Sequence, residues 1–307
     1  MKKILLSIVF FFLFSSVGYA GPCLTTIASA STNQLACADD DILKVTSAGS
    51  ITYSDNKAVD LEDISGVQIT NDGTIQTESG TNKQIAINAE SSLNTTITNN
   101  GTINSDNKYG VILNYAENVV ITNNAGATIS ADGNTAIYGK NVGNCHFNGT
   151  NCHSDLSGQS NGVGLTLHNH GTITSQHETV WLGSGSSGAH RSKGIKIYNY
   201  DGGIIKTTDE GDSPIKGFHL VDFEFINYQG GTIEGDDRHA VNTEQSEDIN
   251  FTNNGTITAE DKSAFYCKTC SDVTFNNTGT MTSGNNAVVI SAGDNISITN
   301  SGTITAT

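Results

Sequence analysis

A short phrase that recurs along the whole chain restricts its fold more than any other feature. The phrase is TTITNNGTI at residues 95–103, an alternating β-branched run followed by a polar residue, a glycine and a second apolar run. Clear copies begin at residues 67, 95, 119, 165, 195, 223, 249, 273 and 296, and weaker copies lie at 43–51 and 145–150. Self-similarity at a near-constant spacing is typical of a stacked repeat protein.

The residue that follows the first run marks each repeat, and successive markers lie 21 to 30 residues apart. The markers are Ser47, Asn71, Asn99, Asn123, Asn148, Asn169, Asn199, Asn227, Asn253, Asn277 and Asn300. Helical and leucine-rich repeats need longer apolar stripes than these short runs, which glycine and asparagine interrupt. One repeat contains three short strand candidates, at 101–105, 110–114 and 118–122. We therefore predict an all-β fold, a parallel β-helix of about eleven rungs with three strands each, right-handed because about 98% of parallel crossovers are.

The alternation in TTITNNGTI predicts the direction of each side chain. Thr95, Ile97 and Asn99 should point to one side and the threonines between them to the other. We expect Ile97 to join an apolar column in the core. The amide of Asn99 should hydrogen-bond to equivalent amides about 4.8 Å away, so the ten asparagine markers predict an Asn ladder. Asn99 also tolerates a left-handed backbone, and Gly101 should permit a tight turn.

Residues 1–20 are predicted to be a secretory signal peptide. Lys2 and Lys3 precede the apolar run 4–14, and Ala20 ends the segment. Residues 21–42 are expected to form an N-terminal cap and residues 43–307 the β-helix. Without the signal, thirteen basic and thirty-one acidic residues remain, a net charge of −18. A surface so acidic repels phosphate backbones, so nucleic acid is not an expected partner.

The six cysteines are close to one another in sequence in three pairs. They are Cys23 with Cys37, Cys145 with Cys152, and Cys267 with Cys270. Fifteen connectivities are possible. We favour these local disulfides, because an exported chain meets an oxidising environment and a β-helix keeps neighbouring residues on one rung or the next. A redox role for residues 267–270 would require a strand leading into a helix, which the pattern does not predict.

The longest interval between markers, residues 169–199, contains Trp181, the single tryptophan of the chain. Residues 183–194 (GSGSSGAHRSKG) are expected to form a loop outside the β-helix. We favour the interpretation that this loop is an insertion on the surface that the fold tolerates and that has no function of its own. If the loop does bind a partner, Trp181 and Arg191 are the candidate contacts.

Two site hypotheses concern chemistry rather than binding. His168 and His170, with Cys145, Cys152 and His153 nearby, suggest a metal site, but the spacing matches no standard zinc pattern, and we expect no metal or other cofactor. Residues 235–239 (GDDRH) contain the Gly-Asp-Asp of polygalacturonase-like enzymes, which makes Asp236, Asp237 and His239 candidates for acid–base hydrolysis. Adjacent strand residues face opposite ways, and the other signatures of those enzymes are missing, so we expect no catalysis.

The signal peptide, the glycine-, asparagine- and threonine-rich rungs and the close-set cysteines together resemble the passenger domains of Gram-negative autotransporters (type V secretion). The resemblance implies export through the inner membrane, an outer-membrane β-barrel translocator, and display at the cell surface or release. No translocator strands follow in this sequence, so we expect a fragment or a chain exported without its own barrel, and an open last rung able to associate end to end. Adhesion to a surface carbohydrate or protein is the leading expectation.

Two alternatives remain open. One is a polysaccharide hydrolase or lyase that uses Asp236, Asp237 and His239. The other is an ice- or surface-binding protein, because an outward column of threonines is predicted, interrupted by His168, Tyr198 and Asn276. The threonines of this column are Thr70, Thr98, Thr122, Thr252 and Thr299.

Overall fold

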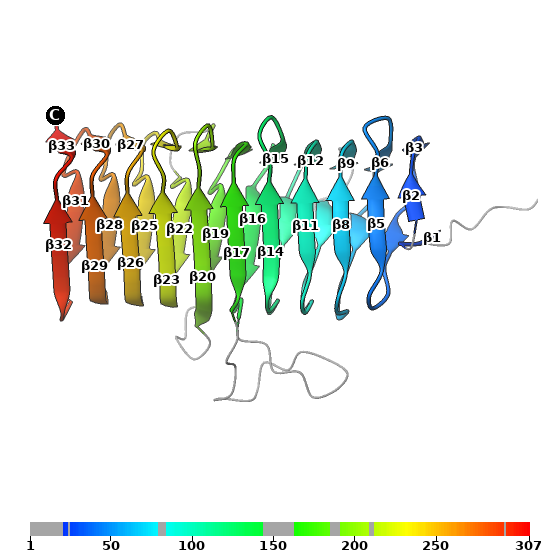
Figure 1. The fold of residues 1–307 in the computed structure, drawn as a ribbon, viewed down its shortest axis with the longest axis horizontal. Helices are drawn as coiled ribbons and strands as arrows, with labels where there is room; N and C mark the ends of the chain where they lie inside the picture. The colour runs from blue at the N-terminus through cyan, green and yellow to red at the C-terminus, as the bar shows by residue number, and fades with distance from the viewer. Residues whose placement is uncertain are drawn as a thin grey trace, which may run out of the picture.

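The computed structural model describes residues 21–23, 25–78, 84–143, 163–184, 191–208, 212–291 and 293–307. All regular elements in these residues are β-strands, and they form three parallel sheets of eleven strands each. Successive strands of the chain belong to successive sheets, so every turn contributes one strand to each sheet (Figure 1).

Counted from residue 21, the first strand of each turn belongs to sheet A. Its strands are β1 (Gly21–Pro22), β4 (Leu35–Ala36), β7 (Lys57–Asp60), β10 (Ile85–Asn88), β13 (Tyr109–Ile112), β16 (Thr135–Lys140), β19 (Val180–Gly183), β22 (Ile215–Phe218), β25 (Val241–Glu244), β28 (Phe265–Lys268) and β31 (Val288–Ser291).

Sheet B contains the strands that carry the repeated phrase. They are β2 (Thr25–Ile27), β5 (Ile42–Val45), β8 (Gln68–Asn71), β11 (Thr96–Asn99), β14 (Val119–Asn123), β17 (Leu165–Asn169), β20 (Ser192–Asn199), β23 (Leu220–Asn227), β26 (Glu247–Asn253), β29 (Ser271–Asn277) and β32 (Ile296–Asn300).

Sheet C follows sheet B across a short turn. Its strands are β3 (Ala30–Ser31), β6 (Ser50–Tyr53), β9 (Thr74–Thr77), β12 (Thr102–Ser105), β15 (Thr128–Ala131), β18 (Thr172–Ser175), β21 (Ile204–Thr207), β24 (Thr232–Gly235), β27 (Thr256–Ala259), β30 (Thr280–Ser283) and β33 (Thr303–Ala306).

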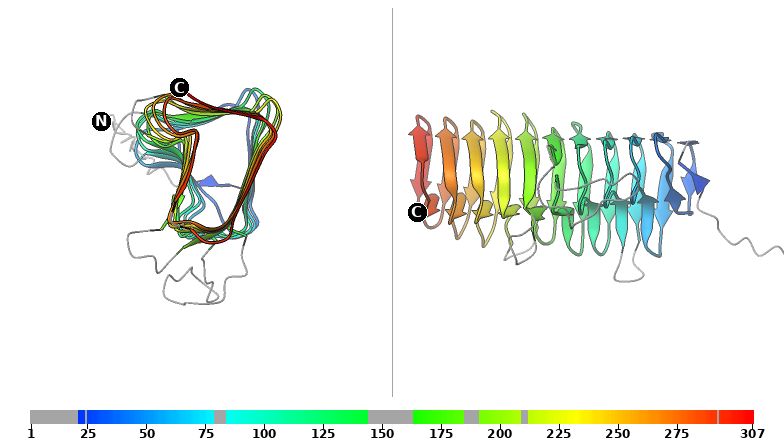
Figure 2. Two further views of the ribbon diagram at one scale, coloured as in Figure 1. Left: turned by 90° about the vertical axis from the view of Figure 1, so that its left-hand side faces the viewer. Right: turned by 90° about the horizontal axis from the view of Figure 1, so that it is seen from below.

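The coil is right-handed. In Figure 1 the strands of sheet B rise on the near side and those of sheet A descend behind them, while the chain advances from right to left. Viewed along the axis in Figure 2, the turns superimpose around a common interior. The predicted fold class, a parallel β-helix with three strands per turn, is confirmed.

The apolar column predicted through Ile97 lies in the core. Ile97 is fully buried and pairs with Ile69 on one side and Ile121 on the other. In the C-terminal half the same column changes to phenylalanine, and the Phe251 ring stacks between Phe225 at 4.9 Å and Phe275 at 5.1 Å. Like side chains meet on successive turns, so each turn covers the apolar surface of its neighbour.

The asparagines at the end of the sheet B strands are hydrogen-bonded to one another along the axis. Each side-chain Nδ2 donates to Oδ1 of the next asparagine at 2.8–2.9 Å. The series is Asn71, Asn99, Asn123, Asn169, Asn199, Asn227, Asn253, Asn277 and Asn300. Left-handed backbone is found at another corner of the turn, for example at Asn94 and Asn118, and not at Asn99 as expected.

The predicted set of turns requires two corrections, although the number of strands per sheet is eleven. Asn123 pairs and hydrogen-bonds directly with Asn169, so no turn passes through residues 145–150 between them. Asn148 therefore has no place in the ladder, and it lies outside the described residues. At the N-terminus, the residue that pairs with Asn71 in the ladder column is Val45 rather than Ser47. Ile27 pairs with Val45 in turn, so residues that were expected to form a cap already belong to the first turn.

Gly101 is required for the close approach of two turns rather than for a special backbone angle. A Cβ at Gly101 would lie 2.1 Å from the carbonyl oxygen of Gly73, and one at Gly73 would lie 2.1 Å from that of Gly49. Neither residue has a positive φ. The recurrent glycine thus sets the spacing at this corner by having no side chain.

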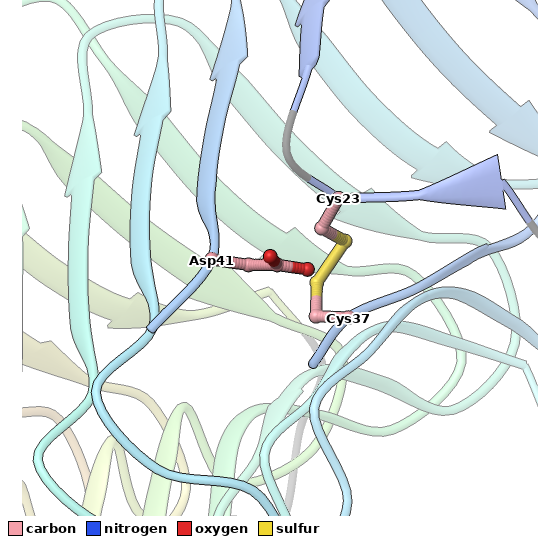
Figure 3. Close-up of side chains that lie close together, drawn as sticks. All are labelled: Cys23, Cys37 and Asp41. Atoms are coloured by element: carbon pink, nitrogen blue, oxygen red, sulfur yellow. A yellow bond between two sulfur atoms is a disulfide. The ribbon is translucent and has the colours of Figure 1, made fainter. Parts of the chain in front are cut away.

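Two of the expected disulfides are present. Cys23 is bonded to Cys37, with Cα atoms 4.7 Å apart, and Cys267 to Cys270, with Cα atoms 5.9 Å apart. The first joins the residue after β1 to the residue after β4 (Figure 3). Cys145 and Cys152 lie outside the described residues, as does the predicted signal peptide. In the part of the chain that the structure describes, no helix has the length and apolarity needed to cross a membrane.

Candidate interaction surface on sheet A

Three aromatic rings stack on the outer face of sheet A. Tyr138 of β16 pairs with Trp181 of β19, and their ring centroids are 4.8 Å apart with planes at 14°. Tyr109 of β13 lies on the other side of Tyr138, at 4.5 Å and 19°. We call Tyr109, Tyr138 and Trp181 the aromatic stack. Desolvation raises the pKa of Tyr109 and of Tyr138 to about 12, so both phenols remain protonated donors at neutral pH.

The ring geometry decides what the aromatic stack offers to a ligand. Because the planes are nearly parallel and the centroids less than 5 Å apart, the ring faces cover one another. The stack therefore presents ring edges and phenol hydroxyls along the rod, not a flat platform. The remaining face of Trp181 is directed toward the next turn, where Lys216 of β22 occupies the paired position.

Trp181 and Arg191 do not form one interaction loop, contrary to the sequence-based expectation. Trp181 belongs to a strand of sheet A, whereas Arg191 immediately precedes β20 of sheet B. The Arg191 guanidinium forms an ion pair with Glu247, with Nη1 and Oε1 2.6 Å apart. Residues 185–190 of the expected loop lie outside the described residues.

A polar hollow of about 310 Å³ continues the line of the aromatic stack toward the C-terminus. Lys216, Asn242 and Tyr266 occupy paired positions on β22, β25 and β28, in the same column as Trp181, and all three line the hollow. The cations Arg238 and Lys268 and the carboxylates Asp212 and Glu244 complete most of its wall. We call this the sheet A hollow. The Lys216 ammonium also forms an ion pair with the Glu178 carboxylate, with Nζ and Oε1 2.7 Å apart.

Asn242 has an unpaired acceptor in the wall of the hollow. Its side chain is 7% exposed, and its Nδ2 donates to Glu244 Oε1 at 3.4 Å. Its Oδ1 is buried and accepts no hydrogen bond from the residues that the structure describes. Leaving a buried polar atom unpaired costs about 1–3 kcal/mol, and most such atoms in folded proteins have a partner. Because Oδ1 has almost no accessible surface, a donor placed in the hollow does not reach it.

His239 and Tyr266 form the aromatic wall of the hollow. Their rings stack with centroids 4.0 Å apart and planes at 15°. The backbone N–H of Ser263 donates to His239 Nδ1 at 3.1 Å, so the proton of the neutral imidazole is on Nε2. Burial, together with the charges of Lys262 and Arg238, lowers the pKa of His239 to about 4. At neutral pH this ring is an uncharged donor.

The residues of the GDDRH segment do not converge on one site. His239 lines the sheet A hollow, whereas Asp236 lines a separate hollow together with Lys206, Glu234 and Glu260. Desolvation and the nearby carboxylate of Asp261 raise the pKa of Asp237. Asp236 and His239 thus line different hollows.

The outer face of sheet B carries the predicted threonine column with its interruptions. Thr98 pairs with Thr70 and Thr122, and the column continues through His168, Tyr198 and Ile226 before Thr252, Asn276 and Thr299. The uninterrupted threonine run is therefore short.

The two described histidines of the metal hypothesis both contact Tyr200. His168 Nδ1 lies 3.0 Å from the Tyr200 hydroxyl, and the His170 ring stacks on Tyr200 at 4.2 Å. Cys145, Cys152 and His153 lie outside the described residues. Within the described part, one group of metal-ligand type is found: Cys23, Cys37 and Asp41 have ligand atoms within 4.8 Å of one another (Figure 3). Both sulfurs are in the disulfide, so no thiolate is available to bind a metal.

The comparisons add no relative. No protein-family model, no curated protein and no solved structure matches the chain.

Proposed function

We propose that this chain is an exported, passenger-type β-helix of a Gram-negative bacterium that acts as an adhesion scaffold without catalysis. The segment 1–20 has the pattern of a secretory signal. Two disulfides in the described residues fit an oxidising compartment. The solenoid supplies a long rigid rod, the form of scaffold on which extended binding faces are built.

The adhesive role is supported above all by the outer face of sheet A. There the aromatic stack leads into the sheet A hollow, which combines buried amide, aromatic and charged groups in one column. Aromatic side chains and arginine are enriched at binding surfaces, and a few such residues supply most of the binding energy. We propose this face as the surface that meets the ligand.

Export is tested by expressing the full chain in a Gram-negative host. We expect a processed protein that begins near Gly21, outside the cytoplasm, with its cysteines oxidised. The matched control replaces Leu5 and Val9 with Asp, which disrupts the apolar run and should leave an unprocessed cytoplasmic chain. Cytoplasmic retention of the unaltered chain would refute the export proposal.

Adhesion is tested with purified residues 21–307 on immobilised glycans and extracellular-matrix proteins. We expect binding that the Trp181→Ala exchange weakens and that Thr98→Ala, on the outer face of sheet B, leaves unchanged. Release of reducing ends from polysaccharides is expected to stay at background. An activity that Asp237→Asn or His239→Gln abolished would support the hydrolase alternative instead.

The ice-binding alternative is tested separately. Because His168, Tyr198, Ile226 and Asn276 interrupt the threonine column, we expect no thermal hysteresis from the purified protein.

A further inference from the structure

We propose that Cys23, Cys37 and Asp41 form a binding site for a zinc-type divalent metal ion when the Cys23–Cys37 disulfide is reduced. In the oxidised protein the two sulfurs are bonded to each other and neither is a ligand. In the reduced protein the metal takes the place of the disulfide as the link that closes the first turn. The site lies at the N-terminal end of the rod, away from the aromatic stack, so it is independent of the proposed adhesive function.

The two cysteines remain neighbours when the bond between them is opened. Strand β1 pairs with β4 in parallel, and Cys23 and Cys37 are the residues that follow these two strands. Their Cα atoms are 4.7 Å apart, which is about the spacing of adjacent strands in a sheet. The backbone N–H of Cys37 also donates to the carbonyl oxygen of Asp60 on the next turn, at 3.0 Å. Strand pairing thus holds the two side chains together, with or without the disulfide.

The Asp41 carboxylate lies beside the two sulfurs (Figure 3). One of its oxygens and the two Sγ atoms are within 4.8 Å of one another. The backbone N–H of Ala38 donates to Oδ2 at 2.8 Å, and the backbone oxygen of Asp41 accepts from the N–H of Gln68 at 2.9 Å. From the described residues the carboxylate accepts only the Ala38 hydrogen bond and forms no ion pair, so Oδ1 is available as a ligand.

Reduction places two thiols and a carboxylate in a site with little water. Cys23 is fully buried and Asp41 is 9% exposed. Burial and a neighbouring carboxylate both disfavour a thiolate, so the metal-free site keeps its thiols protonated. A divalent cation reverses this preference, because a thiol that coordinates a metal is deprotonated and the charge of the ion compensates the anionic ligands.

Thiolates with a carboxylate are a ligand set that zinc accepts. Zinc holds thiolate sulfurs at about 2.3 Å and carboxylate oxygens at about 2.0–2.2 Å. Three ligand atoms within 4.8 Å of one another therefore reach one ion through small side-chain movements. Three protein ligands leave the fourth tetrahedral position to a water molecule. The soft sulfur ligands select against Mg²⁺ and Ca²⁺, which prefer oxygen.

The reduction itself is an exchange with an external dithiol. One thiolate of the dithiol attacks Sγ of Cys37, the more exposed of the two cysteines, and the Sγ–Sγ bond breaks. The second thiol of the dithiol then resolves the mixed disulfide, and the dithiol leaves in its oxidised, cyclic form. Cys23 and Cys37 have each gained one electron and one proton. Binding of Zn²⁺ releases these two protons to water.

Metal binding is measured on residues 21–307 before and after reduction with a phosphine, which is then removed without oxygen. The probe is Co²⁺, whose thiolate charge-transfer absorption reports sulfur ligation, with Zn²⁺ as the competitor. The other cysteines are removed by the exchanges Cys145→Ala, Cys152→Ala, Cys267→Ala and Cys270→Ala. We expect the reduced chain to bind one Co²⁺ through sulfur and to lose it to Zn²⁺, and the oxidised chain to show no charge-transfer absorption.

Asp41→Asn distinguishes the three-ligand site from a pair of free thiols. The variant keeps both cysteines and can be checked for its fold in the oxidised form. It should bind Co²⁺ at least about tenfold more weakly, since even groups that only orient a ligand contribute about 10–100-fold to metal affinity. Asp40→Asn is the matched control. It removes the same charge from the exposed neighbouring residue and should leave the affinity unchanged.

Amide hydrogen exchange tests whether the metal closes the first turn. Exchange near Leu43 and Val45 should accelerate on reduction and slow again when Zn²⁺ is added. Equal metal binding by oxidised and reduced chains, equal affinities of the Asp41→Asn and Asp40→Asn variants, or exchange that Zn²⁺ leaves unchanged would overturn the proposal. None of these results bears on adhesion, because the effect of Trp181→Ala is measured on the oxidised chain.

Discussion

Asn99 donates a hydrogen bond from Nδ2 to Oδ1 of Asn123 on the next turn at 2.9 Å, and both side chains are fully buried. The same Nδ2 donates to the carbonyl oxygen of Thr128 at 3.0 Å, and Oδ1 of Asn99 accepts from Asn71 at 2.8 Å. The buried amide thus shares its hydrogen bonds between the asparagines of the turns before and after it and nearby backbone groups. A slip of one residue would place the whole column on the outer face.

Removing one member of this ladder should destabilise the protein. Asn99→Ala leaves Asn71 without its side-chain acceptor and Asn123 without its side-chain donor, so we expect the free energy of unfolding to fall by about 1–3 kcal/mol. Urea denaturation of residues 21–307 measures this. Thr98→Ala, one residue earlier and outward, should stay within about 0.5 kcal/mol of the unaltered protein. Equal effects of the two exchanges would show that the ladder contributes no more than a surface residue.

A methyl group at Gly101 should be poorly tolerated. Its Cβ would lie 2.1 Å from the Gly73 carbonyl oxygen, so the turns must separate, and overpacking of this kind costs about 1–3 kcal/mol. The equivalent position one turn later is already alanine: Thr172 N donates to Ala127 O as Thr102 N donates to Gly73 O. Ala127→Gly should therefore change the urea midpoint much less than Gly101→Ala. A neutral Gly101→Ala would mean that this corner can open without cost.

The sequence predicts sheet B well because its signal is repeated and local. Ile97 and Asn99 are inward positions that alternate with outward ones in every clear copy, so the inward column and the ladder follow from one phrase. Residues 145–150 resemble the phrase, yet Asn123 pairs directly with Asn169, and this pairing of distant residues could not be predicted from the phrase. The position of Val45 in the ladder column depends on pairing in the same way.

The candidate surface on sheet A could not be located from the same phrase. Tyr138, Trp181 and Tyr266 lie in strands whose sequences, TAIYGK, VWLG and FYCK, share little with one another. The turns between these strands and the phrase also differ in length, so a common column appears only in the fold. An alignment of the sheet A strands with one another would have indicated Tyr138 and Trp181. The unpaired Oδ1 of Asn242 depends on three-dimensional packing and has no sequence signal.

The Cys23–Cys37 disulfide should hold the first turn on the stack. Replacing both cysteines with alanine frees a loop closed over a sequence separation of 14, for which a loss of about 2–4 kcal/mol is expected. Because each turn contacts its neighbours, amide hydrogen exchange should accelerate near Leu43 and Val45 and remain unchanged near Asn227. The Cys267–Cys270 disulfide closes a sequence separation of only 3. The matched variant, in which both of these cysteines are replaced with alanine, should therefore lose less stability. Uniform acceleration along the whole rod would contradict this local role.

Acidification should weaken the fold through His239. Its pKa is about 4 in the folded protein, whereas an unperturbed histidine in the unfolded chain has a pKa of about 6.5. Between these values the unfolded state binds the proton and the folded state does not, so the contribution of His239 to stability falls as the pH is lowered from about 6.5 to about 4. Urea denaturation across this window should show a steeper decline for the unaltered protein than for His239→Gln, which has no titrating group there. NMR titration of the His239 ring gives an independent check: a midpoint near 6.5 would show that the imidazole is not held neutral by burial, and that Nδ1 can take up a proton in place of the hydrogen bond it accepts from the Ser263 N–H.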